Sequence, residues 1–258
     1  MPESDLTLLV EAAEEAGRIA NHFFDGDPKV WHKPEGAGPV TEADLAVDDM
    51  LRSNLTAARP DYGWLSEESE DTSARLDAQR VFVVDPIDGT RAFIDRGSDW
   101  GHSLAVVDNG TVVAAAVHLP RHGLTFAAAL GEGATRNGAP INASSRTSLA
   151  DSEVLATRPN LDPHHWRSAA APPFHRAFRS SLAYRLCLVA EGQFDAMLTL
   201  RPTWEWDVAA GALIVSEARG AVTDRRGSTP RFNNRQPQID GMIAGGIALH
   251  AQLLDALA

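Results

Sequence analysis

Two aspartates, together with the residues between and after them, have the composition of a cation and phosphate site. Asp85, Pro86 and Asp88 follow an apolar, β-branched run that predicts a buried strand. We expect Pro86 to end this strand, because proline cannot donate to a sheet ladder. Gly89 permits an unusual φ, and Thr90 is suited to cap a helix at its N-terminus. Carboxylates beside free backbone N–H groups can hold a hard cation and its anion, although ordinary solvated turns share this composition.

Three further acidic positions could reach the same place. Glu67 follows a predicted strand at 62–65 just as Asp85 follows its own, so both carboxylates could converge on one cation. Asp207 falls in the first turn of a predicted helix, where it either complements the helix dipole or faces the site. Asp44 falls in the first turn of another predicted helix, and it either complements that dipole or orients a catalytic group.

The charge of the chain restricts its partners. Its 258 residues carry a formal net charge of -12, and the sequence pI is about 5.1. Such a surface repels polymeric nucleic acid, and it would also repel a small phosphorylated metabolite unless bound cations reverse the local field. With Cys187 as the single cysteine, an intrachain disulfide and Cys-based zinc sites are excluded. We find no signal-peptide pattern and no apolar run long enough for a bilayer, so we expect a cytoplasmic protein with no membrane attachment.

The remaining pattern places these residues on a mixed α/β scaffold. Asn109-Gly110 between two β-rich runs is a strong hairpin signal, and a β-rich meander follows it. Near residue 148 the pattern changes to helices alternating with short strands, so we expect two domains, 1–148 and 149–258. Helices are expected at 6–24, 42–55, 180–192, 204–218 and 249–257.

Five ordered motifs resemble those of a known family. V-V-D-P-I-D-G-T at 83–90 resembles the signature of the inositol monophosphatase-like superfamily of lithium-sensitive phosphatases. L-S-E-E at 65–68 is similar to its G-E-E motif, and W-D-V-A-A-G at 206–211 to its second signature. V-T-E-A-D at 40–44 and G-A-T-R-N-G at 133–138 match as well. The resemblance spans nearly the whole chain.

This resemblance implies a fold, a cofactor and a reaction. The implied fold is a layered αβαβα sandwich of the α/β (α+β) class, as in sugar phosphatases. Two or three Mg²⁺ ions would be held by Glu67, Asp85, the Ile87 carbonyl, Asp88 and Asp207. Magnesium prefers such oxygen ligands, and hydrolysis of a phosphomonoester needs an in-line water and charge neutralisation rather than covalent work by the protein. We therefore expect a Mg²⁺-dependent phosphomonoesterase that lithium inhibits.

The resemblance also implies roles for individual residues. Thr90, with Glu67 and Asp44, would orient and activate a water molecule. The phosphate would be received by backbone N–H groups, and the substrate-binding positions would be Asp88, Gly89, Thr90 and Asp207. Lys33 would lie on a mobile loop or hairpin, expected at 26–39, that helps to close over the metals.

Finer motif details resemble the 3'(2'),5'-bisphosphate nucleotidase branch, which removes a phosphate from 3'-phosphoadenosine 5'-phosphate. Typical inositol monophosphatases carry a glutamate shortly before the W-D motif, and the segment 195–201 has no acid at the matching place. Glu205, in the triplet Glu-Trp-Asp, is a further candidate site residue. Ala92 and Ser66 depart from the pattern of this branch. Candidate partners for a second phosphate are Arg91, Arg158, Arg201 and Arg231.

Other functions remain open at this point. Inositol-1-phosphate, histidinol phosphate and fructose 1,6-bisphosphate are alternative substrates of the same reaction class. A non-catalytic module that binds metal or phosphate is an alternative of another functional class. The retention of the acidic residues of the motifs argues against this alternative. The family resemblance also makes a homodimer a candidate assembly.

Overall fold

The chain forms two larger sheets and two short strand pairs in the computed structural model, which describes residues 3–33 and 38–258. The larger sheet has the order β3 (Gly63–Ser66), β4 (Arg80–Asp88), β5 (Gly101–Asp108), β6 (Thr111–Leu119), β7 (Leu124–Ala129), β8 (Gly133–Arg136) and β9 (Ala139–Pro140). The other has the order β11 (His175–Ala177), β10 (Glu153–Leu155), β12 (Ala196–Thr199), β16 (Met242–Gly245) and β14 (Ala221–Thr223). The short pairs are β1 (Val30–His32) with β2 (Pro39–Thr41), and β13 (Thr203–Trp204) with β15 (Gln238–Ile239).

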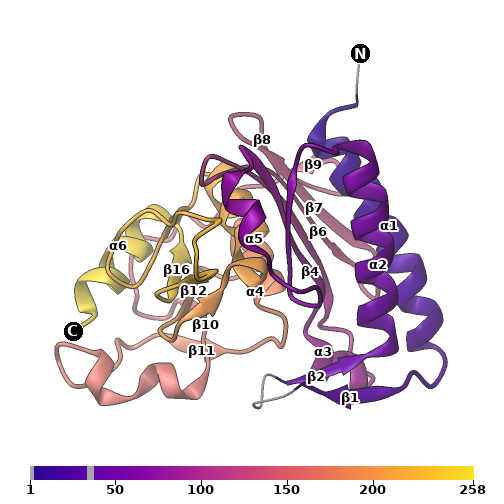
Figure 1. Cartoon of the computed structure of the whole chain (residues 1–258). Helices are drawn as coiled ribbons and strands as arrows, with labels where there is room; N and C mark the ends of the chain where they lie inside the picture. Colours follow the sequence, from indigo (N-terminus) through magenta and orange to yellow (C-terminus); the bar gives the residue numbers. More distant parts are fainter. Residues whose placement is uncertain (1–2, 34–37) are drawn as a thin grey trace.

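The α-helices lie in three layers around these sheets. Their bounds are α1 (Asp5–Phe24), α2 (Glu42–Ala58), α3 (Thr90–Ile94), α4 (Leu182–Ala190), α5 (Glu205–Glu217) and α6 (Ile247–Ala256). Figure 1 shows α1 and α2 on the outer side of the larger sheet, α4 and α5 between the sheets, and α6 on the opposite side of the molecule.

Alternation of side chains along the strands produces this layering. On β4, Phe82 and Val84 pack with α1 and α2, whereas Val83 packs in the cluster that contains α4 and α5. On β12, Met197 joins the cluster of α4 and α5, and Leu198 joins that of α6. Because successive side chains of a strand point to opposite faces, each sheet is covered on both sides. The predicted αβαβα sandwich is confirmed.

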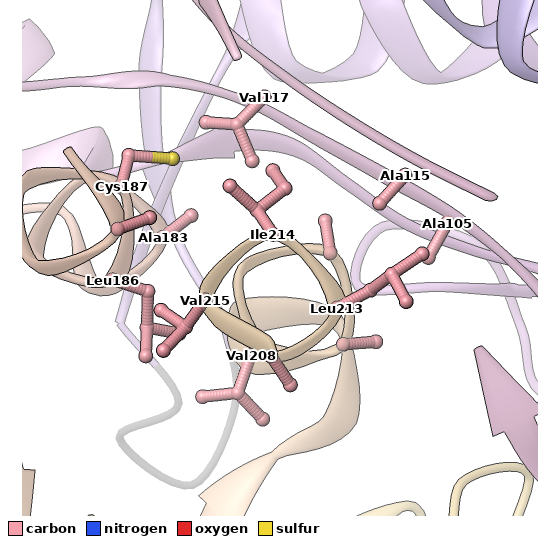
Figure 2. Packing of buried hydrophobic residues seen from close by; sticks show 14 of the residues in the cluster. Ala105, Ala115, Val117, Ala183, Leu186, Cys187, Val208, Leu213, Ile214 and Val215 are labelled. Carbon is pink, nitrogen blue, oxygen red and sulfur yellow. The ribbon is translucent and has the colours of Figure 1, made fainter. Parts of the chain in front are cut away.

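The central helix α5 is apolar on every face between Val208 and Val215, and all of these residues are buried, which is typical of a helix in the core. Figure 2 shows Leu213 beside Ala105 of the larger sheet and Val215 beside Leu186 of α4. A Cβ at Gly211 would lie 2.5 Å from side-chain atoms of Leu186, so glycine permits the close approach of α4 and α5. The N-terminus of α5, which carries Asp207, is therefore rigidly placed.

The predicted domain boundary lies in a connecting segment. Residue 148 falls between β9 of the larger sheet and β10 of the smaller one, so the two predicted domains separate the strands of the two sheets. One continuous hydrophobic cluster nevertheless joins side chains of both sheets around α4 and α5. The division into 1–148 and 149–258 stays a prediction. Within the described residues, no helix has the length and apolar character needed to cross a membrane.

Two local predictions at β4 are wrong. The strand does not end at Pro86 but continues to Asp88, with a shift of register: Asp85 pairs with Ser103, and Asp88 pairs with Gly101. Three steps along β4 thus match two along β5, which leaves one extra residue on β4. A bulge of this kind leaves a residue without a ladder hydrogen bond, so a proline is tolerated there.

The turn after β4 also differs from the prediction. Gly89, not Thr90, is the residue that precedes α3, and its φ is +96°. A Cβ at this position would lie 2.9 Å from the carbonyl oxygen of Asp99. Both the left-handed backbone and the close approach therefore require glycine, as its place in the motif suggests.

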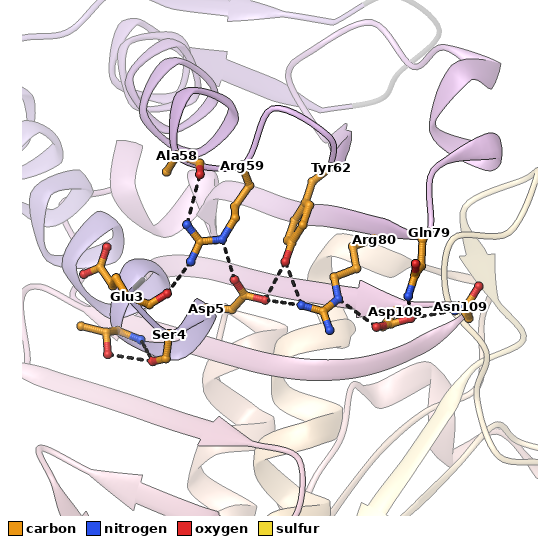
Figure 3. A network of polar contacts seen from close by, with 11 residues as sticks. Glu3, Ser4, Asp5, Ala58, Arg59, Tyr62, Gln79, Arg80, Asp108 and Asn109 are labelled. Atoms are coloured by element: carbon orange, nitrogen blue, oxygen red, sulfur yellow. Dashed lines mark hydrogen bonds and ion pairs between the residues drawn. The ribbon is translucent and has the colours of Figure 1, made fainter. Parts of the chain in front are cut away.

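A polar network fixes the end of β4 that is remote from Asp88 (Figure 3). Asp5 accepts hydrogen bonds from Arg59 Nε at 3.0 Å, from the Tyr62 hydroxyl at 3.0 Å and from Arg80 Nη1 at 3.1 Å. Arg80 Nε also donates to Asp108 at 2.8 Å. These bonds connect the start of α1, the end of α2, and β4 with β5. They hold in place β4, whose other end carries Asp85 and Asp88.

Candidate active site

Two neighbouring strands deliver acidic side chains to one edge of the larger sheet. β3 and β4 are parallel, with Ser66 beside Val84, so Glu67 and Asp85 leave the sheet side by side. Asp207 arrives from the first turn of α5. One carboxylate oxygen from each of Glu67, Asp85 and Asp207 lies within 4.8 Å of the others. The structure thus brings together carboxylates from three distant parts of the chain.

Asp85 is the buried centre of this group. Its side chain is almost fully buried, and its Oδ1 has no hydrogen-bond partner among the described residues. Burial raises its pKa well above the usual range, and the charges of Glu67, Asp88 and Asp207 raise it further. Burying a carboxylate oxygen without a hydrogen-bond donor costs free energy. A bound cation would compensate this cost for several clustered carboxylates at once. The site therefore fits a hard metal ion, and its oxygen donors suit Mg²⁺.

Asp88 lies beside this group and is held by α4. Its Oδ2 accepts hydrogen bonds from the Ser181 hydroxyl and from the Ala183 N–H, both at 2.6 Å. Burial raises the pKa of Asp88 to about 6, although these two bonds and the Arg185 charge lower it. The described residues donate no hydrogen bond to Oδ1, which leaves that oxygen for a cation.

Asp207 completes the acidic cluster from the opposite side. Burial raises its pKa well above the usual range, as do the charges of Asp88 and Glu67, while Arg201 and Lys33 lower it. The Ser103 hydroxyl of β5 donates to the Trp206 carbonyl at 2.8 Å. This bond ties the start of α5 to the larger sheet and so fixes the carboxylate against the strands.

Asp44 and Thr90 form a hydrogen-bonded pair at the rim of the cluster. Thr41 caps α2, and both its N–H and its hydroxyl donate to Asp44 Oδ2, at 2.8 and 2.5 Å. Asp44 Oδ1 then lies 3.2 Å from the Thr90 hydroxyl, which is also 3.1 Å from the Ile87 carbonyl oxygen. Burial raises the pKa of Asp44 to about 6, against the hydrogen bonds from Thr41. Asp44 therefore belongs to the capping box of α2 and additionally contacts Thr90.

Lys33 forms ion pairs with two glutamates at the acidic cluster. Its Nζ lies 2.8 Å from Glu67 Oε1 and 2.7 Å from Glu68 Oε1. Burial lowers the pKa of Lys33, but the two glutamates outweigh this and raise it overall. Burial raises the pKa of Glu68 to about 7, although Lys33 lowers it. The lysine follows β1 in the β1–β2 hairpin; residues 34–37 of the loop predicted at 26–39 lie outside the described residues.

The acidic cluster lines a cleft of about 710 Å³. Other predicted site residues at this cleft are Ile87, Gly89, Thr90, Arg91 and Arg201. Acidic residues among its described lining are those already named: Glu67, Asp85, Asp88 and Asp207. The N–H groups of Gly89 and Thr90 stand at the start of α3, where helical N–H groups have no partner inside the helix.

Three candidate residues are placed elsewhere. Glu205 accepts hydrogen bonds from the N–H groups of Asn233 and Asn234, at 2.6 and 2.9 Å, and so secures the segment before β15. Its side chain cannot point in the same direction as that of Asp207, because positions two residues apart lie about 200° apart around the helix axis. Arg231 donates to the Asn109 carbonyl at the β5–β6 turn. The third, Arg158, is not among the described residues that line the cleft.

Other cleft residues did not emerge from the sequence. Arg185 lines the cleft, and burial lowers its pKa to about 10 while Asp88 and Asp207 counteract this. It is the charged residue of the otherwise apolar helix α4, a signal that could have identified it. Phe178 and Trp204 also line the cleft. Aromatic residues give no comparable signal, because most of them are core residues.

Comparisons with known proteins agree with this geometry. Residues 1–257 match the model of the inositol monophosphatase family. An inositol-1-monophosphatase of Mesorhizobium japonicum is 29% identical over 98% of this chain and 95% of its own. A 3'(2'),5'-bisphosphate nucleotidase CysQ of Salmonella typhimurium is 30% identical over 90% of this chain and 95% of its own. A histidinol-phosphatase of Chlorobaculum parvum is 30% identical over 98% and 96%.

Solved structures show the same architecture. The extragenic suppressor protein suhB from Bartonella henselae superposes with a TM-score of 0.82, at 29% identity and with 96% of each chain covered. An inositol monophosphatase of Thermotoga maritima gives a TM-score of 0.84, at 26% identity, with 97% of this chain and 95% of the other covered. The fold, the acidic cluster and the full-length family match agree, and the chain belongs to the inositol monophosphatase family of phosphoric monoester hydrolases.

Proposed function

We propose that this phosphatase hydrolyses 3'-phosphoadenosine 5'-phosphate and that two or three Mg²⁺ ions support the reaction. The ions would be held by Glu67, Asp85, the Ile87 carbonyl, Asp88 and Asp207. The unpaired buried oxygen of Asp85 supports a cation at this place. Bound Mg²⁺ supplies the positive charge that brings phosphate oxygens and a water together.

The protein contributes positioning and proton transfer. Asp44 is held by two bonds from Thr41, so its second oxygen presents a fixed acceptor to the Thr90 hydroxyl. When that hydroxyl donates to Asp44, its oxygen lone pairs can accept from a water in the cleft. The charge of Glu67 contributes to the raised pKa of Asp44, so the two carboxylates lie close together, and Glu67 can receive the proton that the water loses. The free N–H groups of Gly89 and Thr90 can bind phosphate oxygens.

The observation that carries the choice of substrate is the set of arginines in the cleft. Arg91, Arg185 and Arg201 line the same cleft as the acidic cluster. In a chain with a net charge of -12, three arginines around one cleft indicate more than one anionic group on the substrate. An inositol ring would instead need acceptors for its hydroxyl groups. The described acidic residues at the cleft belong to the metal cluster, and Leu200 lies where β12 ends.

A substrate comparison tests this proposal. We expect the purified protein with Mg²⁺ to hydrolyse 3'-phosphoadenosine 5'-phosphate with a kcat/KM at least about tenfold above that for the two substrates with a single phosphate, because one additional charge-assisted contact is worth about 1.5–3 kcal/mol. The competing substrates are inositol-1-phosphate, histidinol phosphate and fructose 1,6-bisphosphate, each measured as phosphate release. A higher kcat/KM for any of these three would refute the proposed substrate.

A further inference from the structure

Two aromatic rings lie unburied at the cleft that holds the acidic cluster. Phe178 is 46% exposed and Trp204 is 42% exposed, and both line the cleft. Large rings such as those of Phe82 and Trp100 are buried in the core, whereas Trp31, outside the cleft lining, is 44% exposed. Leaving a large apolar surface in water loses the free energy that its burial would provide. Exposed rings at a site that binds a small molecule therefore indicate a surface that the ligand covers.

Trp204 is held in place by its neighbours. Its ring stacks on that of Trp206, with 4.8 Å between centroids and 9° between planes. Its backbone pairs with Gln238 between β13 and β15, and it directly precedes α5. Since Asp207 follows Trp206 in the sequence, the exposed indole has a fixed position relative to a carboxylate of the acidic cluster. A rigid ring loses little conformational entropy when a flat ligand stacks on it.

Phe178 is fixed in a different way, through an arginine of the cleft. The Arg185 guanidinium carbon lies 4.5 Å from the Phe178 ring centroid, and Arg185 Nε donates to the Arg179 carbonyl. The guanidinium therefore contacts the ring, and Arg185 lines the same cleft as Asp88. A cation beside an aromatic face forms a small recognition unit for a ring that bears an anion.

We propose that Trp204 and Phe178 bind the purine ring of the substrate, and that these two residues determine selectivity for nucleotides over polyol phosphates. This inference rests on the proposed function and deepens it. A flat heteroaromatic ring offers the π-face that stacking on Trp and Phe requires, and stacking tolerates any base. A polyol would also need acceptors for its hydroxyl groups, and the described acidic residues of the cleft belong to the acidic cluster.

The test compares a substrate that has a ring with one that lacks it. Trp204→Ala and Phe178→Ala are each assayed with 3'-phosphoadenosine 5'-phosphate and with glycerol 2-phosphate. We expect kcat/KM for the nucleotide to fall about 5- to 150-fold, the range for loss of one base–aromatic stack. The value for glycerol 2-phosphate should stay within about twofold. Trp204→Phe, which keeps a ring, should restore most of the loss, and Leu130→Ala, at a position 55% exposed outside the cleft lining, should change neither value.

A second measurement separates this proposal from the choice of substrate. Inhibition of glycerol 2-phosphate hydrolysis by adenosine 5'-monophosphate and by inorganic phosphate is measured for the wild type and Trp204→Ala. The variant should lose inhibition by the nucleotide and keep inhibition by phosphate. A wild type that does not hydrolyse 3'-phosphoadenosine 5'-phosphate would refute the proposed function, while ring-selective inhibition would still support the aromatic site. An equal loss with both substrates, or unchanged inhibition by the nucleotide, would overturn the role of these rings.

Discussion

Replacing Asp88 with asparagine should stabilise the metal-free protein while it destroys activity. Burial raises the pKa of Asp88 to about 6 in the folded chain, from a usual value of 3.8. The folded state thus binds a proton more tightly than the unfolded state. A carboxyl with a raised pKa leaves stability intact below pH 3.8, and its penalty develops as pH rises from 3.8 to about 6 and is complete above that pH. At pH 8 a shift of about two pH units corresponds to about 3 kcal/mol of destabilisation that Asp88→Asn removes.

The structure indicates that most of this gain survives the substitution. The side-chain oxygen of the new asparagine can still accept hydrogen bonds from the Ser181 hydroxyl and the Ala183 N–H, so both donors keep a partner. Hydrogen bonds to a neutral acceptor are weaker than those to a carboxylate, which offsets about 1 kcal/mol. The net gain is then about 2 kcal/mol, or a rise in Tm of about 4–8 °C for a chain of this size.

The assay is thermal unfolding with EDTA at pH 8 and at pH 4.5, for the wild type, Asp88→Asn and the exposed control Asp61→Asn. We expect the full gain at pH 8 and a smaller gain at pH 4.5, where Asp88 is protonated in the folded wild type while the unfolded chain is still largely ionised at this residue. Phosphate release with Mg²⁺ should fall at least about 100-fold in Asp88→Asn, a loss typical of removing a group that acts on charge in the transition state. A metal-free Asp88→Asn that is less stable than the wild type at pH 8 would show that the buried charge is not a cost. Near wild-type turnover would remove Asp88 from the site.

Three other substitutions test neighbouring parts of the site. The Ser66 hydroxyl donates to Asp48 at 2.5 Å, and Asp48→Asn replaces this charged acceptor with a weaker, neutral one. The free energy of unfolding in urea should fall by about 1–3 kcal/mol, and calorimetry should show weaker Mg²⁺ binding. Gly89→Ala combines a φ of +96° with a Cβ only 2.9 Å from the Asp99 carbonyl oxygen, so Tm should fall by an amount equivalent to about 1–3 kcal/mol and phosphate release should be lost. Glu205→Gln should cost about 1–3 kcal/mol in urea unfolding and leave kcat/KM within a few-fold, since the carboxylate serves the segment before β15. A large loss of kcat/KM in a stably folded Glu205→Gln would return this residue to the site.

The sequence predicts best what local patterns determine. Helix α2 begins after Thr41 with a capping box, and the β5–β6 hairpin turns at Asn109 and Gly110, both with positive φ. The convergence of Glu67 and Asp85 was also accessible, because carboxylates that follow two strands meet if the strands are parallel neighbours. These features depend on short segments whose residue types allow few conformations.

Side-chain orientations that depend on tertiary packing could not be predicted from the sequence in the same way. Arg231 has the residue type of a phosphate ligand, yet it bonds the Asn109 carbonyl because the segment before β15 packs on the β5–β6 turn. Arg185 can be recognised in the sequence as the charged residue of an apolar helix, but this pattern does not show that its side chain reaches the cleft. Glu205 differs, because helix geometry alone places it about 200° from Asp207. Its assignment to the site could have been rejected without a structure.

The bulge in β4 explains how one strand supplies two acidic residues to the same cleft. In a regular strand, residues three apart point to opposite faces, so Asp85 and Asp88 would be separated by the sheet. The extra residue of β4 between these two positions reverses the alternation and turns Asp88 to the side of Asp85. Buried His102 secures the bulge, because its Nδ1 contacts the Pro86 carbonyl and must donate to it. Burial lowers the pKa of His102 to about 3, so this donor stays neutral and adds no charge beside the cluster. The proline that appeared to end the strand is thus part of the device that assembles the acidic site.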